Sequence, residues 1–523
     1  MRVTNNMITS NTKNNINSNK VFVDKYNTQM TTQKKIDKPS DDPVIAIRSL
    51  RMQTSLRHID QYLTNNIADV ESWLEITDTA LENMTKILTD AHTLCVHGST
   101  DTLTQDDRKT ILKQLTAMSD QIYAEGNADY AGRTVFTGYR TSSQLTFKTD
   151  EQDTTYQIEQ NFTYKDLEER RYYYGSTEVP ADASIECTTK IGEKTYNRIR
   201  LAYDNINGEK RADGTTAGTV IGYQPAATET DPSPAFVENK ILINGKEVDI
   251  TNTYETAEDW SQAIAAGDPL ASDDPDNPKV AFIKETGELI FTSKYANELS
   301  RNNASINVSY TKTGFDAGEA RPEYYYNCTM QKPDMDAPVK YTKENQQINF
   351  EISNGIMLPA NTQASEVLST DIGRDMNEMI DIVNTAINAH DKVDQIKHMM
   401  SLAQYEDEDS QKMLQTYLDA AEKEADYADD NLKKTYKQYL TNFSGYMEKV
   451  NIAHTNVGSL KQRLDLTKTR VENQQATVSE LKSNNDNRDI SDIIIDYYAA
   501  YNAYTSSLTA ASKIGSQTLL NYL

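Results

Sequence analysis

The sequence predicts an α+β protein, with one discontinuous antiparallel helical bundle built from both chain ends and a β-rich central insert of two subdomains. Eleven of the 13 prolines lie between residues 140 and 360, where they would interrupt long helices. Outside that window, apolar residues recur at steps of three and four, as on one face of a helix. The formal charge of −25 argues against nucleic acid and membrane insertion as modes of binding.

The helical part is predicted to begin at a motif of Pro39, Ser40, Asp41, Asp42 and Pro43. Asp42 can cap the first turn, and Pro43 fits the first helical position because no N–H is needed there. Periodic apolar residues then predict one helix over 43–98 and a second helix that ends near residue 126. The seam predicted to be buried in the bundle consists of Leu63, Ile67, Val70, Leu74, Leu81, Met84, Leu88, Val457, Leu460 and Leu464.

The two terminal segments differ in apolar content. Residues 1–42 carry only a thin apolar seam, so we expect them to be disordered until assembly, with a frayed tail as the alternative. The C-terminal segment carries a regular apolar stripe that offers a surface for assembly or for a chaperone. This stripe consists of Ile494, Tyr497, Tyr501, Tyr504, Leu508, Ala511, Leu519, Leu520 and Tyr522.

The insert alternates short apolar runs with turn residues. Residues 240–250 predict a hairpin around Asn244 and Gly245, and residues 256–266 predict a short helix. Residues 222–234 contain three prolines and predict a linker between two subdomains. The predicted segments are a terminal segment over 1–42, the helical bundle over 43–139 and 361–490, two β-rich subdomains over 140–230 and 231–360, and an assembly helix over 491–523.

Motifs of catalysis, metal binding or cofactor binding are missing from the sequence, so we predict a protein that is not an enzyme and has no cofactor. His92 and His97 flank Cys95, but these histidines lie on different helix faces, and a buried thiol with two solvent-side histidines is favoured. The acidic run over 406–409 fits a solvated helix start better than a cation site. The first 20 residues lack the apolar region of a cleavable signal peptide, and long apolar runs are absent.

Several motifs resemble the flagellin family. At the start these are Met1-Arg-Val-Thr-Asn-Asn-Met7, Lys35-Ile-Asp-Lys-Pro-Ser-Asp-Asp-Pro43 and Tyr130-Ala-Gly-Arg-Thr-Val-Phe-Thr-Gly-Tyr-Arg-Thr141. At the end they are Asp489-Ile-Ser-Asp-Ile493 and Leu519-Leu-Asn-Tyr-Leu523. One departure concerns Thr31-Thr-Gln-Lys-Lys-Ile36, where the family usually has Ser-Ser-Gly before Lys-Arg-Ile, so the expected turn lacks its glycine.

The resemblance implies a structural protein of the bacterial flagellum, and the chain ends look like those of the family members that join hook to filament. Such proteins are exported through the flagellar type III apparatus and form a ring at the hook tip. The implied partners are the adjacent hook-associated protein, flagellin subunits, further copies of the chain and an export chaperone at the C-terminal helix. A filament-forming flagellin, or an adhesin displayed through the insert, remains an alternative because the insert is long.

Overall fold

The computed structural model describes residues 5–100, 104–182, 186–206, 209–210, 216–217, 220–225, 235–271, 278–333, 335 and 337–516. The chain divides into two compact units. The first unit comprises Met1–Glu71, Asn349–Leu358 and Lys461–Leu523, and the second comprises Ser72–Ile348 and Pro359–Leu460. Long helices from both chain ends and a large central sheet are present, so the predicted α+β class is confirmed.

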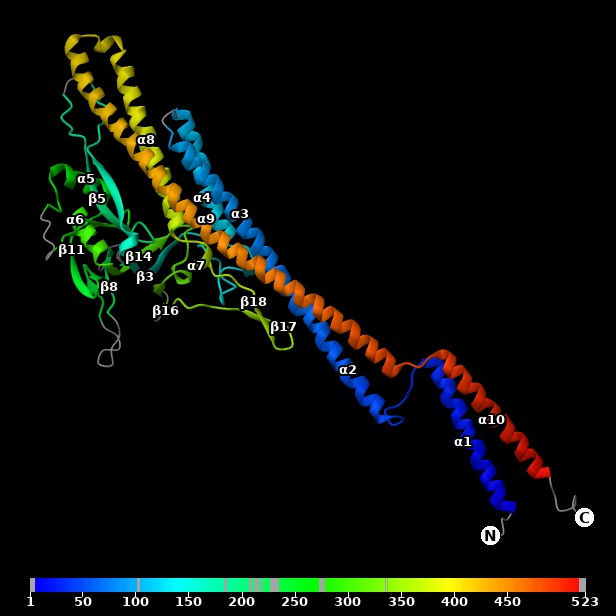
Figure 1. The fold of residues 1–523 in the computed structure, drawn as a ribbon. Helices are drawn as coiled ribbons and strands as arrows, with labels where there is room; N and C mark the ends of the chain where they lie inside the picture. The colour runs from blue at the N-terminus through cyan, green and yellow to red at the C-terminus, as the bar shows by residue number, and fades with distance from the viewer. Residues whose placement is uncertain are drawn as a thin grey trace, which may run out of the picture. The chain divides into compact units, whose positions relative to one another are not determined.

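The first unit is mainly helical and draws on both ends of the chain. Within it, α1 and α10 lie side by side (Figure 1). The predicted helix over residues 43–98 is confirmed, because α2, η1 and α3 follow one another without a break. The elements that contribute to this unit are α1 (Asn5–Thr32), α2 (Pro43–Gln61), η1 (Tyr62–Ile67), α3 (Ala68–Gly98), α9 (Glu408–Asp486), α10 (Ile490–Ser516), β17 (Asn349–Ser353) and β18 (Ile356–Pro359).

The segment η1 is a π-helix, which the apolar periodicity did not predict. The hairpin of β17 and β18 contacts this segment through Glu351. The Tyr62 hydroxyl donates to Glu351 Oε1 at 3.1 Å, and Asn66 Nδ2 donates to the Glu351 carbonyl at 2.7 Å. A π-turn holds more residues than an α-turn, and such turns are rare and local. Here the widened turn presents two polar side chains to one strand.

Helices α3 and α9 run antiparallel to each other. In the second unit, His454 Nε2 lies 3.0 Å from Asp78 Oδ1. In the same unit, the Thr89 hydroxyl lies 3.6 Å from Met447 Sδ. Residue numbers rise along one helix as they fall along the other, which is the antiparallel arrangement that the sequence predicted. The second unit adds α4 (Gln105–Gly126) and α8 (Asp371–Met400), which lie in contact with each other.

A sheet of twelve strands dominates the described part of the insert, and its strands run β16-β15-β3-β14-β10-β11-β12-β13-β5-β4, with β8 and β9 paired beside β14. In Figure 1 this sheet lies beside the α8 and α9 pair. Strands β11 and β12 pair in parallel across the intervening α5, and the other pairs are antiparallel. The strands are β3 (Glu151–Thr163), β4 (Glu168–Tyr174), β5 (Gly192–Arg200), β8 (Ile221–Tyr223), β9 (Val237–Glu238), β10 (Lys240–Ile243), β11 (Lys246–Tyr254), β12 (Val280–Ile283), β13 (Glu288–Phe291), β14 (Ser305–Phe315), β15 (Asn327–Gln331) and β16 (Val339–Tyr341).

The shared sheet contradicts the predicted division of the insert into two subdomains at residue 230. Strand β3 pairs with β14 over a long register, from Ser305 opposite Thr163 to Phe315 opposite Glu151. Strand β5 likewise pairs with β13. Each pairing joins a strand that precedes residue 230 to a strand that follows it. One sheet therefore contains strands of both predicted subdomains. Most of the predicted linker, residues 226–234, lies outside the described residues.

Several local predictions in the insert are confirmed. The hairpin of β10 and β11 turns at Asn244 and Gly245, whose φ angles are 50° and 78°. Two successive positive φ angles are what a type I′ turn requires, and Asn-Gly is the pair that adopts them with least strain. The predicted short helix is α5 (Ala257–Ala266), capped by Thr256. The helices α6 (Ser293–Arg301) and α7 (Ala364–Val367) were not predicted.

Further short elements complete the described chain. They are the hairpin of β1 (Asp129–Tyr130) and β2 (Arg133–Thr134), the pair β6 (Glu209–Lys210) and β7 (Thr216–Ala217), and the 3₁₀ turns η2 (Tyr164–Asp166), η3 (Pro322–Tyr324) and η4 (Ala403–Tyr405).

The insert leaves the helices and returns to them at neighbouring points. The Ala364 N–H donates to the Phe136 carbonyl at 2.8 Å, and the Tyr139 N–H donates to Gln346 Oε1 at 2.8 Å. The segment that follows α4 is therefore hydrogen bonded to the start of α7.

Candidate functional site

The predicted helix-start motif forms a turn and a capped helix. The Asp42 carboxylate accepts from the Val44 and Ile45 N–H groups at 2.9 and 3.2 Å, and Pro43 is the first helical residue. The neighbouring Asp41 accepts from two backbone N–H groups of the preceding turn, which lowers the pKa of its carboxyl. Pro39 and Ser40 lie in that turn. Both carboxylates thus serve the backbone of this motif.

Just before this motif, the two ends of the chain are joined by backbone hydrogen bonds. The Lys35 N–H donates to the Asp486 carbonyl at 2.8 Å, and the Arg488 N–H donates to the Gln33 carbonyl at 2.9 Å. Gln33 has a φ of 55° and stands at the position where the sequence comparison above expected a glycine. The left-handed turn at the end of α1 therefore forms without a glycine, at the cost of backbone strain.

The residues of the predicted bundle seam are mostly buried. Eight are buried, namely Ile67, Val70, Leu74, Leu81, Met84, Leu88, Val457 and Leu464. Leu63 and Leu460 are half-buried. Leu63 and Ile67 lie in η1, and the other N-terminal members lie in α3.

The predicted C-terminal stripe is divided between two faces of α10. Tyr497, Tyr504 and Ala511 are half-buried, on the face whose Ser507 hydroxyl receives a hydrogen bond of 2.6 Å from Asn19 of α1. The other face is exposed and apolar, and it is defined here as the α10 stripe: Ile490, Ile494, Ile495, Tyr498, Tyr501 and Leu508. The predicted members Leu519, Leu520 and Tyr522 lie outside the described residues.

Part of α10 thus has a partner within the chain, and that partner is the segment expected to be disordered. Ile493, which the predicted stripe omitted, is fully buried in this pairing region. Both α1 and α10 are helical in the structure, whereas their order before assembly stays a prediction.

A buried ion cluster connects the sheet to α8 and α9, and no motif in the sequence predicted it. Arg198 of β5 is 1% exposed, and its guanidinium contacts Glu378 of α8 at 2.8 Å and Glu168 of β4 at 3.1 Å. Arg170 of β4 adds a further contact to Glu378 at 2.9 Å. From α9, the Tyr439 hydroxyl donates to Glu378 at 2.6 Å. Elements far apart in sequence therefore share one carboxylate.

The charges of this cluster stabilise one another. Burial raises the pKa of Glu378, but Arg198 and Arg170 outweigh it and hold that pKa well below its usual range. Burial raises the pKa of the neighbouring Asp375 by more than Arg200 lowers it. The alternation of Arg198 and Arg200 along one strand is the signal that could have indicated a charged face on β5.

The two places considered above as metal sites, Cys95 and the acidic run over 406–409, have structural roles. Cys95 is fully buried with its Sγ 3.4 Å from Met379 Sδ, and burial raises the pKa of its thiol to about 12. The acidic run starts α9, where Asp407 accepts from the Ser410 N–H at 2.8 Å. In the described ranges, groups of ligands suited to a metal ion are absent and all three cysteines are free. The helices described there include none long and apolar enough to span a bilayer.

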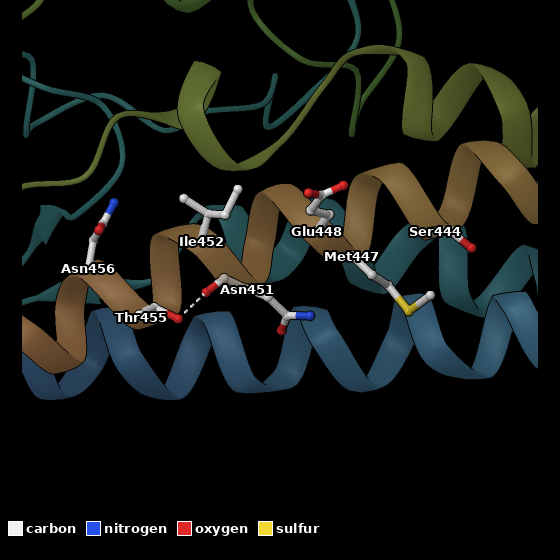
Figure 2. A pocket seen from close by; sticks show the side chains of 7 residues that line it. All are labelled: Ser444, Met447, Glu448, Asn451, Ile452, Thr455 and Asn456. Atoms are coloured by element: carbon white, nitrogen blue, oxygen red, sulfur yellow. Dashed lines mark hydrogen bonds between the residues drawn. The ribbon is translucent and has the colours of Figure 1, made fainter.

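A shallow hollow of about 510 Å³ lies along α9, lined by Ser444, Met447, Glu448, Asn451, Ile452, Thr455 and Asn456. Figure 2 shows that these side chains all project from this one helix, and the dashed line there is the bond from the Thr455 hydroxyl to the Asn451 carbonyl. Because one helix cannot surround a ligand, this hollow does not form a binding site.

Comparison with known proteins points to one class. Residues 3–141 match the family model of the bacterial flagellin N-terminal helical region. The chain is 31% identical to flagellar hook-associated protein 3 of Escherichia coli (strain K12) over 121 residues, which are 23% of this chain and 38% of that protein. It is 28% identical over 145 residues to flagellar hook-associated protein 3 of Salmonella typhimurium, covering 27% of this chain and 45% of that protein. The match thus spans less than half of each curated relative.

Solved structures also resemble the chain. A putative flagellar hook-associated protein from Vibrio parahaemolyticus matches 86% of this chain and all of its own, at 13% identity and a TM-score of 0.34. FlgL of Xanthomonas campestris matches 83% of this chain and 99% of its own, at 12% identity and a TM-score of 0.29.

Proposed function

We propose that this chain, whose residues 3–141 carry a flagellin N-terminal helical region, is a structural adaptor that joins the hook of the bacterial flagellum to its filament. The observation that carries this proposal is the N-terminal match, together with relatives named flagellar hook-associated protein 3. The backbone bonds that join the two chain ends support it, because both ends must be ordered together to form one assembly surface.

The adaptor is secreted and assembles as a ring at the hook tip. Its neighbours there are the adjacent hook-associated protein, flagellin subunits and further copies of itself. The proposed adaptor role requires no catalysis.

We place the surface for neighbouring subunits, or for an export chaperone before export, on the α10 stripe. Ile494, Tyr501 and Leu508 are exposed there at 38%, 46% and 42%. Apolar side chains at helical spacing that remain exposed are typical of an interaction face. A chain that lacks its last 20 residues loses Leu508 together with the predicted members Leu519, Leu520 and Tyr522, and it should stay soluble but neither assemble nor bind a chaperone.

A matched pair of point variants sharpens the test. Leu508→Asp places a charge in the α10 stripe, whereas Ala510→Asp places the same charge on a different face of the same exposed turn. We expect Leu508→Asp to abolish incorporation into flagella and Ala510→Asp to retain it. Equal incorporation of both variants would remove the α10 stripe from the assembly surface.

Deletion of the gene distinguishes the adaptor hypothesis from the alternative that the protein is a filament subunit. Loss of an adaptor should leave intact hooks and release filament subunits into the medium. If hooks persist and a shortage of filament subunit is the only defect, the adaptor proposal fails. Electron microscopy with a labelled chain gives an independent answer, at one junction for an adaptor or along the whole filament for a flagellin.

A further inference from the structure

A cavity of about 750 Å³ lies in the second unit, between the sheet and the α8 and α9 pair. Its walls come from β4, from α5, from the β12–β13 turn and from the facing sides of both helices. Small-molecule sites in proteins typically have volumes of about 300 to 1,000 Å³ and form where secondary-structure elements meet. The size and position of this cavity therefore suit a small ligand.

One wall of the cavity is aromatic. Tyr173 of β4 and Tyr427 of α9 have ring centroids 5.4 Å apart with planes inclined at 39°. Both side chains are half-buried and line the cavity, and Lys423 Nζ lies 5.5 Å from the centroid of the Tyr427 ring. Accessible tyrosine rings offer a flat apolar surface next to a polar hydroxyl.

Three other lining groups have hydrogen-bonding capacity to spare. Among the described residues, the exposed carboxylate of Asp381 of α8 and the half-buried side chains of Asn431 of α9 and Ser261 of α5 have no hydrogen-bond partner within the protein. A carboxylate, an amide and a hydroxyl together supply both donors and acceptors. Three different elements thus bring unused polar groups to one cavity, and a ligand with several hydroxyls would satisfy them.

The charge of the cavity restricts the ligand further. The lining arginines are already paired, as in Arg170 with Glu378 at 2.9 Å and Arg374 with Asp204 at 3.0 Å. Burial, followed by the charges of Asp204, Glu378 and Glu285, raises the pKa of Asp381. Among the lining residues, phosphate or carboxylate ligands would find no unpaired arginine and would meet this negative charge.

We propose that the cavity binds a small neutral sugar, with one face of the sugar ring on Tyr173 and Tyr427 and its hydroxyls on Asp381, Asn431 and Ser261. A sugar ring has an apolar C–H face and polar hydroxyls at its edge, which matches one aromatic wall and several unused polar groups. This inference goes beyond the proposed adaptor role, and it gives the insert a binding function of its own.

Titration of the full-length soluble chain tests the proposal, with calorimetry as the readout and glucose, galactose, mannose and N-acetylglucosamine as probes. Glucuronate serves as the anionic comparison. We expect at least one neutral sugar to bind and glucuronate to bind more weakly than that sugar. Asp381→Ala and Tyr427→Ala should each weaken binding about tenfold, through a lost hydrogen bond or a lost ring face.

Matched controls exclude a general effect of the substitutions. Asp394→Ala removes an exposed aspartate of α8 outside the cavity, and Tyr417→Ala removes a half-buried tyrosine of α9 outside it. Both should bind sugar as the unaltered chain does, and circular dichroism should show that all four variants are folded. The proposal is overturned if none of the neutral sugars binds, if glucuronate binds best, or if the controls weaken binding as much as the cavity variants. Hook–filament joining, measured separately, reports on the adaptor role alone.

Discussion

Gln33 holds a backbone conformation that side chains other than glycine rarely adopt. Its φ of 55° lies in the left-handed region, and its carbonyl accepts a bond from Arg488. For an L-residue this conformation costs about 1–2 kcal/mol. Since the turn forms anyway, the contacts between the two chain ends must outweigh that strain.

Replacement of Gln33 by glycine should therefore stabilise this turn. We expect a gain of about 1 kcal/mol, because the relief of strain exceeds the extra entropy that glycine loses on folding. Slower hydrogen exchange at residues 33–38 and 486–488 would report it. As a control, Gln53→Gly in the middle of α2 should lower helix stability by about 1 kcal/mol. A loss of protection in Gln33→Gly would contradict the strain interpretation.

Arg198 is the centre of the buried ion cluster, and its removal should be costly. Arg198→Met leaves the carboxylates of Glu168, Glu288 and Glu378 short of a partner, so we expect the second unit to lose about 3–5 kcal/mol of stability. Denaturant unfolding measures the loss. Arg171→Met breaks the more exposed pair with Glu193 and should cost about 1 kcal/mol or less. Similar losses in both variants would argue against the cluster as the anchor of the sheet.

The same cluster predicts how stability depends on pH. The pKa of Glu378 is held well below its ordinary value of 4.5, so its stabilising contribution is complete above that value and is lost as the pH falls. The raised pKa of Asp375 acts in the opposite direction, because protonation of that buried carboxyl is favoured in the folded state. The denaturant concentration at the midpoint of unfolding should fall as the pH is lowered from about 6 to 3. Glu378→Gln should flatten the slope of this midpoint against pH. An unchanged slope in that variant would assign the acid sensitivity elsewhere.

The elements differ in how far the sequence could predict them. Helix starts and the Asn244–Gly245 hairpin depend on neighbouring residues, so Pro43 and this turn were predicted at their correct positions. The pairing of β3 with β14 joins residues more than a hundred positions apart, and local patterns carry no information on it. The π-helical turn at η1 and the ion cluster at Arg198 depend on distant partners in the same way.

The predicted C-terminal stripe shows the same limit. A helix reveals its apolar residues in its sequence, but not which of two faces meets a partner. Ile493 was omitted although it is fully buried, whereas Ile494 and Leu508 were included and remain exposed. The pairing with α1 decides between these faces, and it was not predicted.

This division between faces can be tested on α10 itself. Ile493→Ala removes a buried side chain and should destabilise the α1–α10 pair by about 2–5 kcal/mol. Ile495 is 66% exposed on the same helix, so Ile495→Ala should leave the pair nearly unchanged. Hydrogen exchange in residues 5–32 provides the readout. Equal protection in the two variants would mean that Ile493 does not hold the pair together.

At the scale of the whole molecule, the two units have unequal cores. Among the described residues, most of the buried apolar side chains belong to the second unit, whereas the first unit buries comparatively few, such as Ile59 and Val70. Less buried apolar area means less stabilisation against the entropy of the unfolded chain.

Heating should therefore unfold the chain in two steps, with the first unit at the lower temperature. Trp73 and Trp260 both belong to the second unit and are buried. Tryptophan fluorescence should consequently change only in the second step, while far-ultraviolet circular dichroism should change in both. A single transition seen at one temperature by both probes would mean that the units unfold together.

The meeting of Phe136 with Ala364 has a consequence for how such chains can diversify. Because the outgoing and incoming segments of the chain are hydrogen bonded to each other, the distance between them does not depend on the number of residues in between. A change of length in the turns of that stretch therefore leaves the flanking helices in register, provided that β4 and β5 keep Arg170 and Arg198 against Glu378 of α8. Evolution can therefore vary these turns, and a foreign domain grafted into one of them would be displayed without redesign of either terminus.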